Sequence, residues 1–158
     1  MRRIALAAAA LALTAVAGEA SAQSQSVTFS VEPINQMTVS GNPGALTINA
    51  ATVGSGLTSA TDASTTWGIT TNQTGTKVTA SIEEAMPAGV TLKVQLGAPT
   101  NATSANVTLG TTAADVVTGI TKLDETGKTI TYTLSATAAA GVVASASRTV
   151  TYTVVAGS

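Results

Sequence analysis

The feature that most constrains this chain is a period-two alternation of apolar and polar residues, broken by turn residues at short intervals. In one run, residues 90–96, every second side chain is apolar: Val90, Leu92, Val94 and Leu96. Such side chains line opposite faces of a β-strand, so one face packs while the other meets solvent. Similar runs recur at residues 27–31, 37–39, 46–50, 67–69, 78–82, 107–109, 116–123, 130–136 and 150–154.

Groups of residues typical of turns separate these runs, at 41–44, 72–75, 86–89 and 124–127. In the last group we expect Gly127 to adopt a positive φ. Residues 54–64, 97–105 and 138–147 are expected to be loops. The pattern predicts an all-β protein, an antiparallel immunoglobulin-like β-sandwich of about 8–10 short strands. The alternative is an eight-stranded outer-membrane barrel, which needs aromatic girdles, whereas the chain has four aromatic residues.

The first 22 residues predict a secretory signal peptide. Arg2 and Arg3 form a positive start, residues 4–17 are apolar, and Ala20, Ser21 and Ala22 match a cleavage site before Gln23. An uncleaved membrane anchor is the alternative, but a spanning helix needs about 20 apolar residues. We therefore expect a signal peptide over residues 1–22 and one secreted domain over residues 23–158, with no membrane insertion of the mature chain.

The charge and cysteine content narrow the partners and the compartment. Removal of 22 of the 158 residues leaves 136, with five basic and seven acidic side chains, a formal charge of −2. Such a balance does not favour nucleic acid or anionic lipid. The chain has no cysteine, so export adds no disulfide and no lipid anchor on Cys. We expect an extracellular, cell-surface or periplasmic location.

The side chains predict no enzyme and no cofactor. The chain has no histidine, which removes the usual general base and the Ser-His-Asp arrangement. A Ser-Lys dyad would have to use one of the four lysines, Lys77, Lys93, Lys122 and Lys128. We expect these lysines to be solvated.

Two adjacent carboxylate pairs, Glu83 with Glu84 and Asp124 with Glu125, lie beside turn signals. Neighbours on an extended chain point to opposite faces, so neither pair converges by itself. Calcium is a further alternative, because loop oxygens suit it. Asp62, Asp115 and Asp124 could contribute, but no calcium-loop spacing is present. We therefore predict no metal site.

Trp67 is the one strong candidate for binding sugar rings. It shares a strand face with Ile69, which favours a core position over an exposed platform. Residues 128–136 and 148–156 are also nearly the same sequence at an offset of 20. We interpret them as two similar strands with Tyr132 and Tyr152 on comparable faces.

Residues 141–152 (GVVASASRTVTY) resemble the closing strand of fimbrial and spore-coat-U-like subunits. Those subunits have incomplete immunoglobulin-like folds and take a strand from a neighbour. The resemblance implies that residues 23–31 donate a strand, through Val27, Phe29 and Val31. This chain differs in lacking cysteine and in continuing six residues beyond Tyr152.

Trp67, Gly68 and Ile69 are similar to the W-x-L motif of WxL cell-wall-binding surface domains, with Ile in place of Leu. Both resemblances imply a cell-surface role. We expect a non-enzymatic structural or adhesive protein, a filament subunit that pairs with itself through a sheet edge. The alternative is a module that binds glycan or cell wall, with Trp67 exposed.

Overall fold

The computed structural model describes residues 21–157. The chain divides into two units, Met1–Val31 and Glu32–Ser158. The apolar run of the expected signal peptide lies outside the described residues. All secondary structure among the described residues belongs to the second unit, called the body below.

The described body contains nine strands and one short 3-10 helix. In chain order they are β1 (Asn35–Val39), β2 (Ala51–Thr52), β3 (Gly56–Leu57), β4 (Ala60–Ile82), β5 (Val90–Leu96), β6 (Thr103–Ser104), β7 (Val107–Thr108), β8 (Ala114–Ala136), η1 (Ala138–Ala140) and β9 (Val150–Val155). The prediction of an all-β chain is confirmed.

Seven strands form one antiparallel sheet, with β4 and β8 as its central pair. Its main path runs β1-β4-β8-β5-β7, while β6 pairs with β8 and β9 pairs with β4. The hairpin of β2 and β3 is separate. The predicted antiparallel arrangement is therefore confirmed.

The two central strands are much longer than the sequence indicated. β4 and β8 have 23 residues each, and each merges two predicted strands. The expected turns at 72–75 and 124–127 are irregularities inside continuous strands, with register shifts near Thr71, Thr74 and Thr76. Gly75 and Gly127 have φ of 75° and 70°, which lets the backbone bend without ending the pairing.

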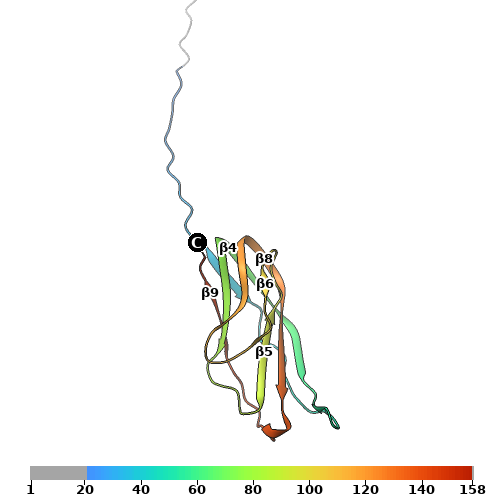
Figure 1. Cartoon of the computed structure of the whole chain (residues 1–158). Coiled ribbons are helices and arrows are strands. Elements are labelled where there is room, and N and C mark those ends of the chain that lie inside the picture. The colour runs from blue at the N-terminus through green and yellow to red at the C-terminus, as the bar shows by residue number, and fades with distance from the viewer. Residues whose placement is uncertain (1–20, 158) are drawn as a thin grey trace, which may run out of the picture. The chain divides into compact units, whose positions relative to one another are not determined.

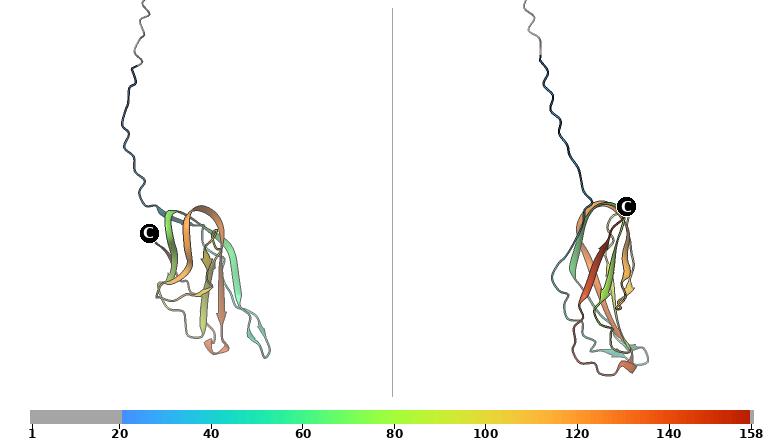
Figure 2. Two further views of the ribbon diagram at one scale, coloured as in Figure 1. Left: turned by 45° about the horizontal axis from the view of Figure 1, so that its top comes forward. Right: turned by 90° about the vertical axis from the view of Figure 1, so that its left-hand side faces the viewer.

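The paired strands β4 and β8 bend over one end of the body (Figures 1 and 2). The first half of β4 and the second half of β8 carry β1 and β5, and the other two halves carry β9 and β6. The hydroxyls of Tyr132 and Tyr152 meet at 2.8 Å between these two groups. This arrangement is consistent with a sandwich-like fold.

The alternation of the sequence determines which side chains form the core. The fully buried set comes mainly from β4, β5 and β8, and its largest members are Trp67, Leu96, Ile120, Ile130, Val78, Val94, Val116 and Val117. The run in β5 shows the predicted pattern directly, because Leu92, Val94 and Leu96 are buried while Lys93 and Gln95 are exposed.

Two predicted strands are absent from the described residues. Residues 27–31 and 46–50 alternate in sequence but form no ladder. The prediction of strands there was wrong, because no neighbouring strand pairs with them. The expected loop at 54–64 was also partly wrong, since β3 lies within it and β4 begins at Ala60, and the expected loop at 97–105 contains the two-residue strand β6. Among the described residues, no helix has the length and apolar character to cross a membrane.

Candidate functional site

The N-terminal segment, residues 23–31, exposes apolar side chains on alternate positions. Val27, Phe29 and Val31 are 76, 89 and 80% exposed, and the segment contains no strand. It carries no charged residue. An uncharged, alternating segment with free backbone groups has the chemistry of a strand without a partner.

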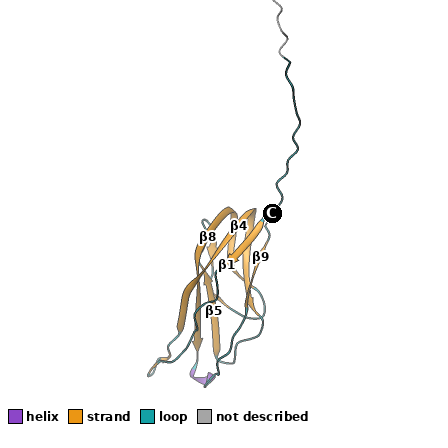
Figure 3. Cartoon of the chain, turned by 180° about the vertical axis from the view of Figure 1, so that it is seen from behind, coloured by secondary structure: helices purple, strands orange, loops and turns teal. Residues whose placement is uncertain are grey.

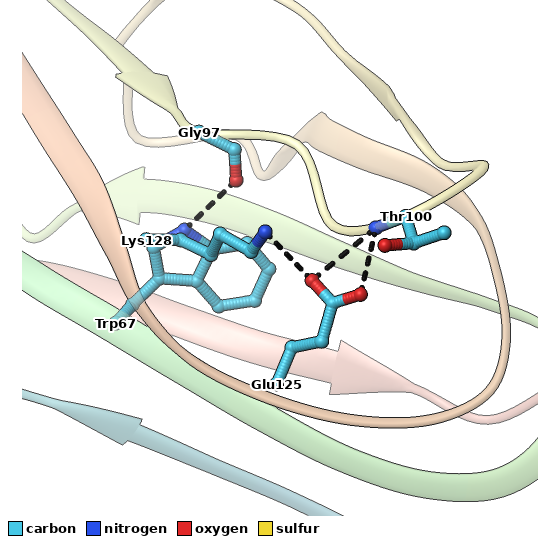
Figure 4. A network of polar contacts seen from close by, with 5 residues as sticks. All are labelled: Trp67, Gly97, Thr100, Glu125 and Lys128. Atoms are coloured by element: carbon cyan, nitrogen blue, oxygen red, sulfur yellow. Dashed lines mark hydrogen bonds and ion pairs between the residues drawn. The ribbon is translucent and has the colours of Figure 1, made fainter.

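Trp67 is part of the core and not a binding platform. The indole is 1% exposed, and its Nε1–H donates to the carbonyl of Gly97 at 3.2 Å (Figure 4). The proposal of Trp67 as a sugar-binding aromatic is therefore wrong. Trp67 and Ile69 share the buried face of β4, so Trp67 has the core position that the sequence favoured.

Glu125 fixes the loop that follows β5 (Figure 4). Its two oxygens accept the Thr100 N–H at 3.1 and 3.3 Å, and Oε2 lies 2.7 Å from Lys128 Nζ. The hydrogen bonds from Lys128 and Thr100 lower the pKa of Glu125 to about 2. The contacts of Glu125 and the Trp67–Gly97 hydrogen bond attach this loop to the central strands β4 and β8. Glu125 therefore has a structural role.

Asp124, which precedes Glu125 in the chain, has a different partner. Asp124 accepts a hydrogen bond from the Thr70 hydroxyl at 2.7 Å. In the second pair, Glu83 accepts the Thr149 N–H at 2.8 Å, and Glu84 lies 3.4 Å from the Arg148 guanidinium. Hydrogen bonds from Thr149 lower the pKa of Glu83. Asp124 and Glu83 therefore each join two separate segments, while Glu84 forms only an exposed ion pair.

The suggested calcium ligands lie apart in the described part of the chain. Asp62 accepts hydrogen bonds from Ser64, which lower its pKa, and Asp115 pairs with Lys77 at 2.9 Å. Within residues 21–157 no three acidic side chains are grouped as metal ligands would be.

The surface of the body is hollowed by a groove of about 350 Å³ with a mixed lining, which includes the polar side chains of Thr47, Ser145 and Arg148. Its lining includes Val90 at the start of β5, Ala136 at the end of β8 and Gly141 directly after η1, and Figure 3 shows η1 at that end of the body. Its apolar lining consists of Leu46, Ile48, Leu57, Met86, Pro87, Val90, Leu134, Ala136, Val143, Ala144 and Ala146. A volume in this range is typical of binding sites.

Two extended segments without ladders contribute to the groove lining. We call residues 45–49 and 142–147 the groove walls. Within residues 21–157, neither wall has a backbone–backbone hydrogen bond. Both walls contain no charged residue. The Ser147 carbonyl accepts a hydrogen bond from the Arg148 guanidinium, and neither wall takes part in a ladder in the described part of the chain.

Arg148 is the one charged residue that lines the groove. Its side chain is 16% exposed, and its guanidinium donates to the carbonyls of Ser147 at 2.8 Å and Ala85 at 3.2 Å. Its Nε is buried without a partner among the described residues. Burial of an unsatisfied donor is costly, and this N–H lies inside the body, out of reach of solvent.

The sequence did not predict the groove. The alternation of residues 46–50 predicted a strand with Leu46 and Ile48 on one face, and both side chains are half-buried. Alternation shows which side chains would face inward, but it does not show whether the backbone finds a ladder. The available signal for the groove was a segment that alternates like a strand but has no evident neighbouring strand.

No family model, no curated protein and no solved structure matches this chain. The resemblances to fimbrial-like subunits and to WxL domains therefore stay predictions, and the function has to be argued from the structure of this chain alone.

Proposed function

We propose that this chain is a non-enzymatic structural or adhesive protein of the cell surface that associates with copies of itself. The signal peptide over residues 1–22 would export it, with cleavage between Ala22 and Gln23. Mass measurement of the exported protein tests that step, since a chain that begins at Gln23 is expected. A chain that retains Met1 would contradict it.

The observation that carries the proposal is the exposure of the N-terminal segment. A protein surface rarely leaves a strand-forming segment with three large apolar side chains uncovered unless it is an interaction site. Phe29 alone is 89% exposed. Pairing with another copy would cover these side chains and satisfy the backbone groups of the segment.

The charged groups support a structural role. Glu125, Asp124, Glu83 and Asp115 each bind a specific backbone or side-chain partner. These contacts join loops and strands to each other. The alternative of a glycan-binding module depended on an exposed Trp67. Because Trp67 is buried, we do not propose it.

The test is size-exclusion chromatography with light scattering on residues 23–158 over a range of concentrations. The first variant combines Val27→Ser, Phe29→Ser and Val31→Ser, and is called the triple-serine variant. The matched control is Val53→Ser, because Val53 is fully exposed and lies outside the N-terminal segment. Circular dichroism checks that each variant keeps its β-structure.

We expect oligomers that grow with concentration for the unmodified chain and for Val53→Ser, and a monomer for the triple-serine variant. A monomer at every concentration for all three proteins would contradict self-association. The same oligomers in all three would show that the N-terminal segment is not the cause.

A further inference from the structure

We propose that Gln23, once signal-peptide cleavage makes it the first residue, cyclises to pyroglutamate, so that the exported chain begins with a blocked and uncharged end. This inference rests on the proposed cleavage between Ala22 and Gln23, and it adds a covalent modification site to the mature chain. It does not depend on self-association.

The side chain of Gln23 has the length that the reaction needs. The α-amine nitrogen attacks the side-chain carbonyl carbon Cδ, a C–N bond forms, and the bond between Cδ and Nε2 breaks. Nε2 takes the proton that the amine gives up and leaves as ammonia, so no oxidant, reductant or second substrate is consumed. The product is a five-membered lactam. Because the nucleophile and the carbonyl belong to one residue, the reaction has the advantage of an intramolecular step.

The chain around Gln23 leaves its side chain free to turn back on the amine. Residues 21–31 are all exposed, and no strand includes them (Figure 1). Among the described residues, the Gln23 amide donates to the Ser21 hydroxyl at 3.3 Å. Ser21 belongs to the part that cleavage removes, so the mature chain would not keep this contact. The amide of Gln23 is then available to its own α-amine.

The position of Gln23 in the mature chain distinguishes it from Gln25. The nitrogen of Gln25 lies in a peptide bond, where resonance removes its nucleophilic character. An exposed α-amine, by contrast, titrates near neutral pH, so a fraction of it is uncharged and nucleophilic. Both glutamine side chains are exposed. Gln25 is therefore a matched control in the same segment.

Cyclisation removes the only charge of the N-terminal segment. Residues 23–31 carry no charged side chain, and the first one in the mature chain is Glu32. A free α-amine would place a positive charge at the start of this segment. Because a charge resists transfer into apolar surroundings, an uncharged end suits a segment whose apolar side chains are exposed and proposed to be covered.

The test measures the intact mass and the N-terminal sequence of the exported protein, expressed as the full chain, with Gln23→Ala and Gln25→Ala as the two variants. Each protein is measured directly after export and again after prolonged incubation at neutral pH. Cyclisation lowers the mass by one ammonia and blocks stepwise sequencing from the N-terminus. Isoelectric focusing measures the loss of one positive charge, and a peptidase that removes pyroglutamate should restore sequencing from Ser24.

We expect the unmodified chain and Gln25→Ala to begin at residue 23, to be lighter by one ammonia and to resist sequencing. Gln23→Ala should keep its full mass, an open amine and a less acidic isoelectric point. A chain that begins with Gln23 at full mass after incubation would overturn the modification and leave the cleavage site intact. Loss of ammonia from Gln23→Ala would place the reaction at another residue, which also overturns the proposal. A chain that begins elsewhere would overturn the cleavage site and the modification together, while self-association is measured separately by light scattering.

Discussion

Residues 90–96 and residues 27–31 have the same alternating pattern, but the structure treats them differently. In β5 the apolar residues Leu92, Val94 and Leu96 are at most 8% exposed, because the strand pairs with β8 and β7. In the N-terminal segment the equivalent side chains are at least 76% exposed. Alternation therefore predicts which face can be buried, while the packing of other elements over that face decides whether it is buried, since Val39 and Val155 lie in paired strands and are still 49 and 38% exposed.

Residues 45–49 lie between these two cases. Leu46 and Ile48 are half-buried and pack at the edge of the body, but the backbone around them has no ladder. This wall has side-chain partners without backbone partners. The comparison of the three regions separates the two contributions to the stability of a strand, which are apolar burial and backbone pairing.

The largest expected effect contrasts Leu96→Ala with Phe29→Ala. Leu96 is fully buried, so its truncation should lower the free energy of unfolding by about 2–5 kcal/mol. Phe29→Ala should change it by less than about 0.5 kcal/mol in the monomer, since exposed positions contribute little. Urea unfolding at low protein concentration measures both. Equal losses would mean that Phe29 is buried in the monomer.

Leu46→Ala should give an intermediate effect. The side chain is half-buried in the groove, so we expect a loss of about 1 kcal/mol, well below that of a core leucine. The same urea experiment measures it, with Val53→Ala as the exposed control. A loss as large as that of Leu96→Ala would place Leu46 in the core and would argue against an open groove.

Tyr132 and Tyr152 show how a polar group is buried together with a partner. Burial raises the pKa of Tyr152 and of Tyr132, and the hydroxyls share a hydrogen bond of 2.8 Å. A phenol with a raised folded pKa stabilises the fold below its unfolded pKa of about 10, and this stability decreases as the pH rises further. These are the only two tyrosines, so ultraviolet titration of the folded protein should show both phenols ionising above their ordinary pKa of about 10.

Tyr152→Phe tests the same contact by mutation. Loss of the hydroxyl leaves Tyr132 without its partner and should cost about 1 kcal/mol of unfolding free energy. Thr151→Val, at an exposed position of the same strand, serves as the control. Normal titration of both tyrosines near pH 10 in the folded protein would show that the pair is open to solvent.

The smallest expected effect comes from Glu125. Its folded pKa of about 2 lies below the ordinary value of 4.5. The stability that this carboxylate contributes is therefore present above about pH 4.5 and is lost as the pH falls towards 2. We expect Glu125→Gln to weaken the acid dependence of the melting temperature over this range. Glu84→Gln is the control, because the Glu84 side chain is 73% exposed. Equal acid profiles for both variants would contradict the role of Glu125 in fixing the loop.

The sequence predicted much of the fold because alternation records burial directly. Strands β5 and β9 appeared close to their observed bounds, and the core position of Trp67 was favoured over exposure. The long strands β4 and β8 were divided in the prediction, because a glycine such as Gly75 or Gly127 has the same signature in a turn and in a bulge.

The groove and its walls could not be predicted from the sequence, for a different reason. Residues 46–50 look like a strand, and nothing local shows that they lack a neighbour. Strand pairing is a property of segments far apart in the chain, as Leu134 with Leu92 or Tyr152 with Ala80 illustrates. The near repeat of residues 128–136 and 148–156 also gave no sign that Tyr132 and Tyr152 would meet hydroxyl to hydroxyl.

Hydrogen exchange of residues 23–158 at two protein concentrations tests the central claim most directly. The claim is that the alternating N-terminal segment, which joins no ladder, finds its backbone partner in another copy. We expect the amides of residues 23–31 to exchange freely in dilute protein and to become protected as the chain associates. Association that leaves residues 23–31 unprotected would contradict the claim.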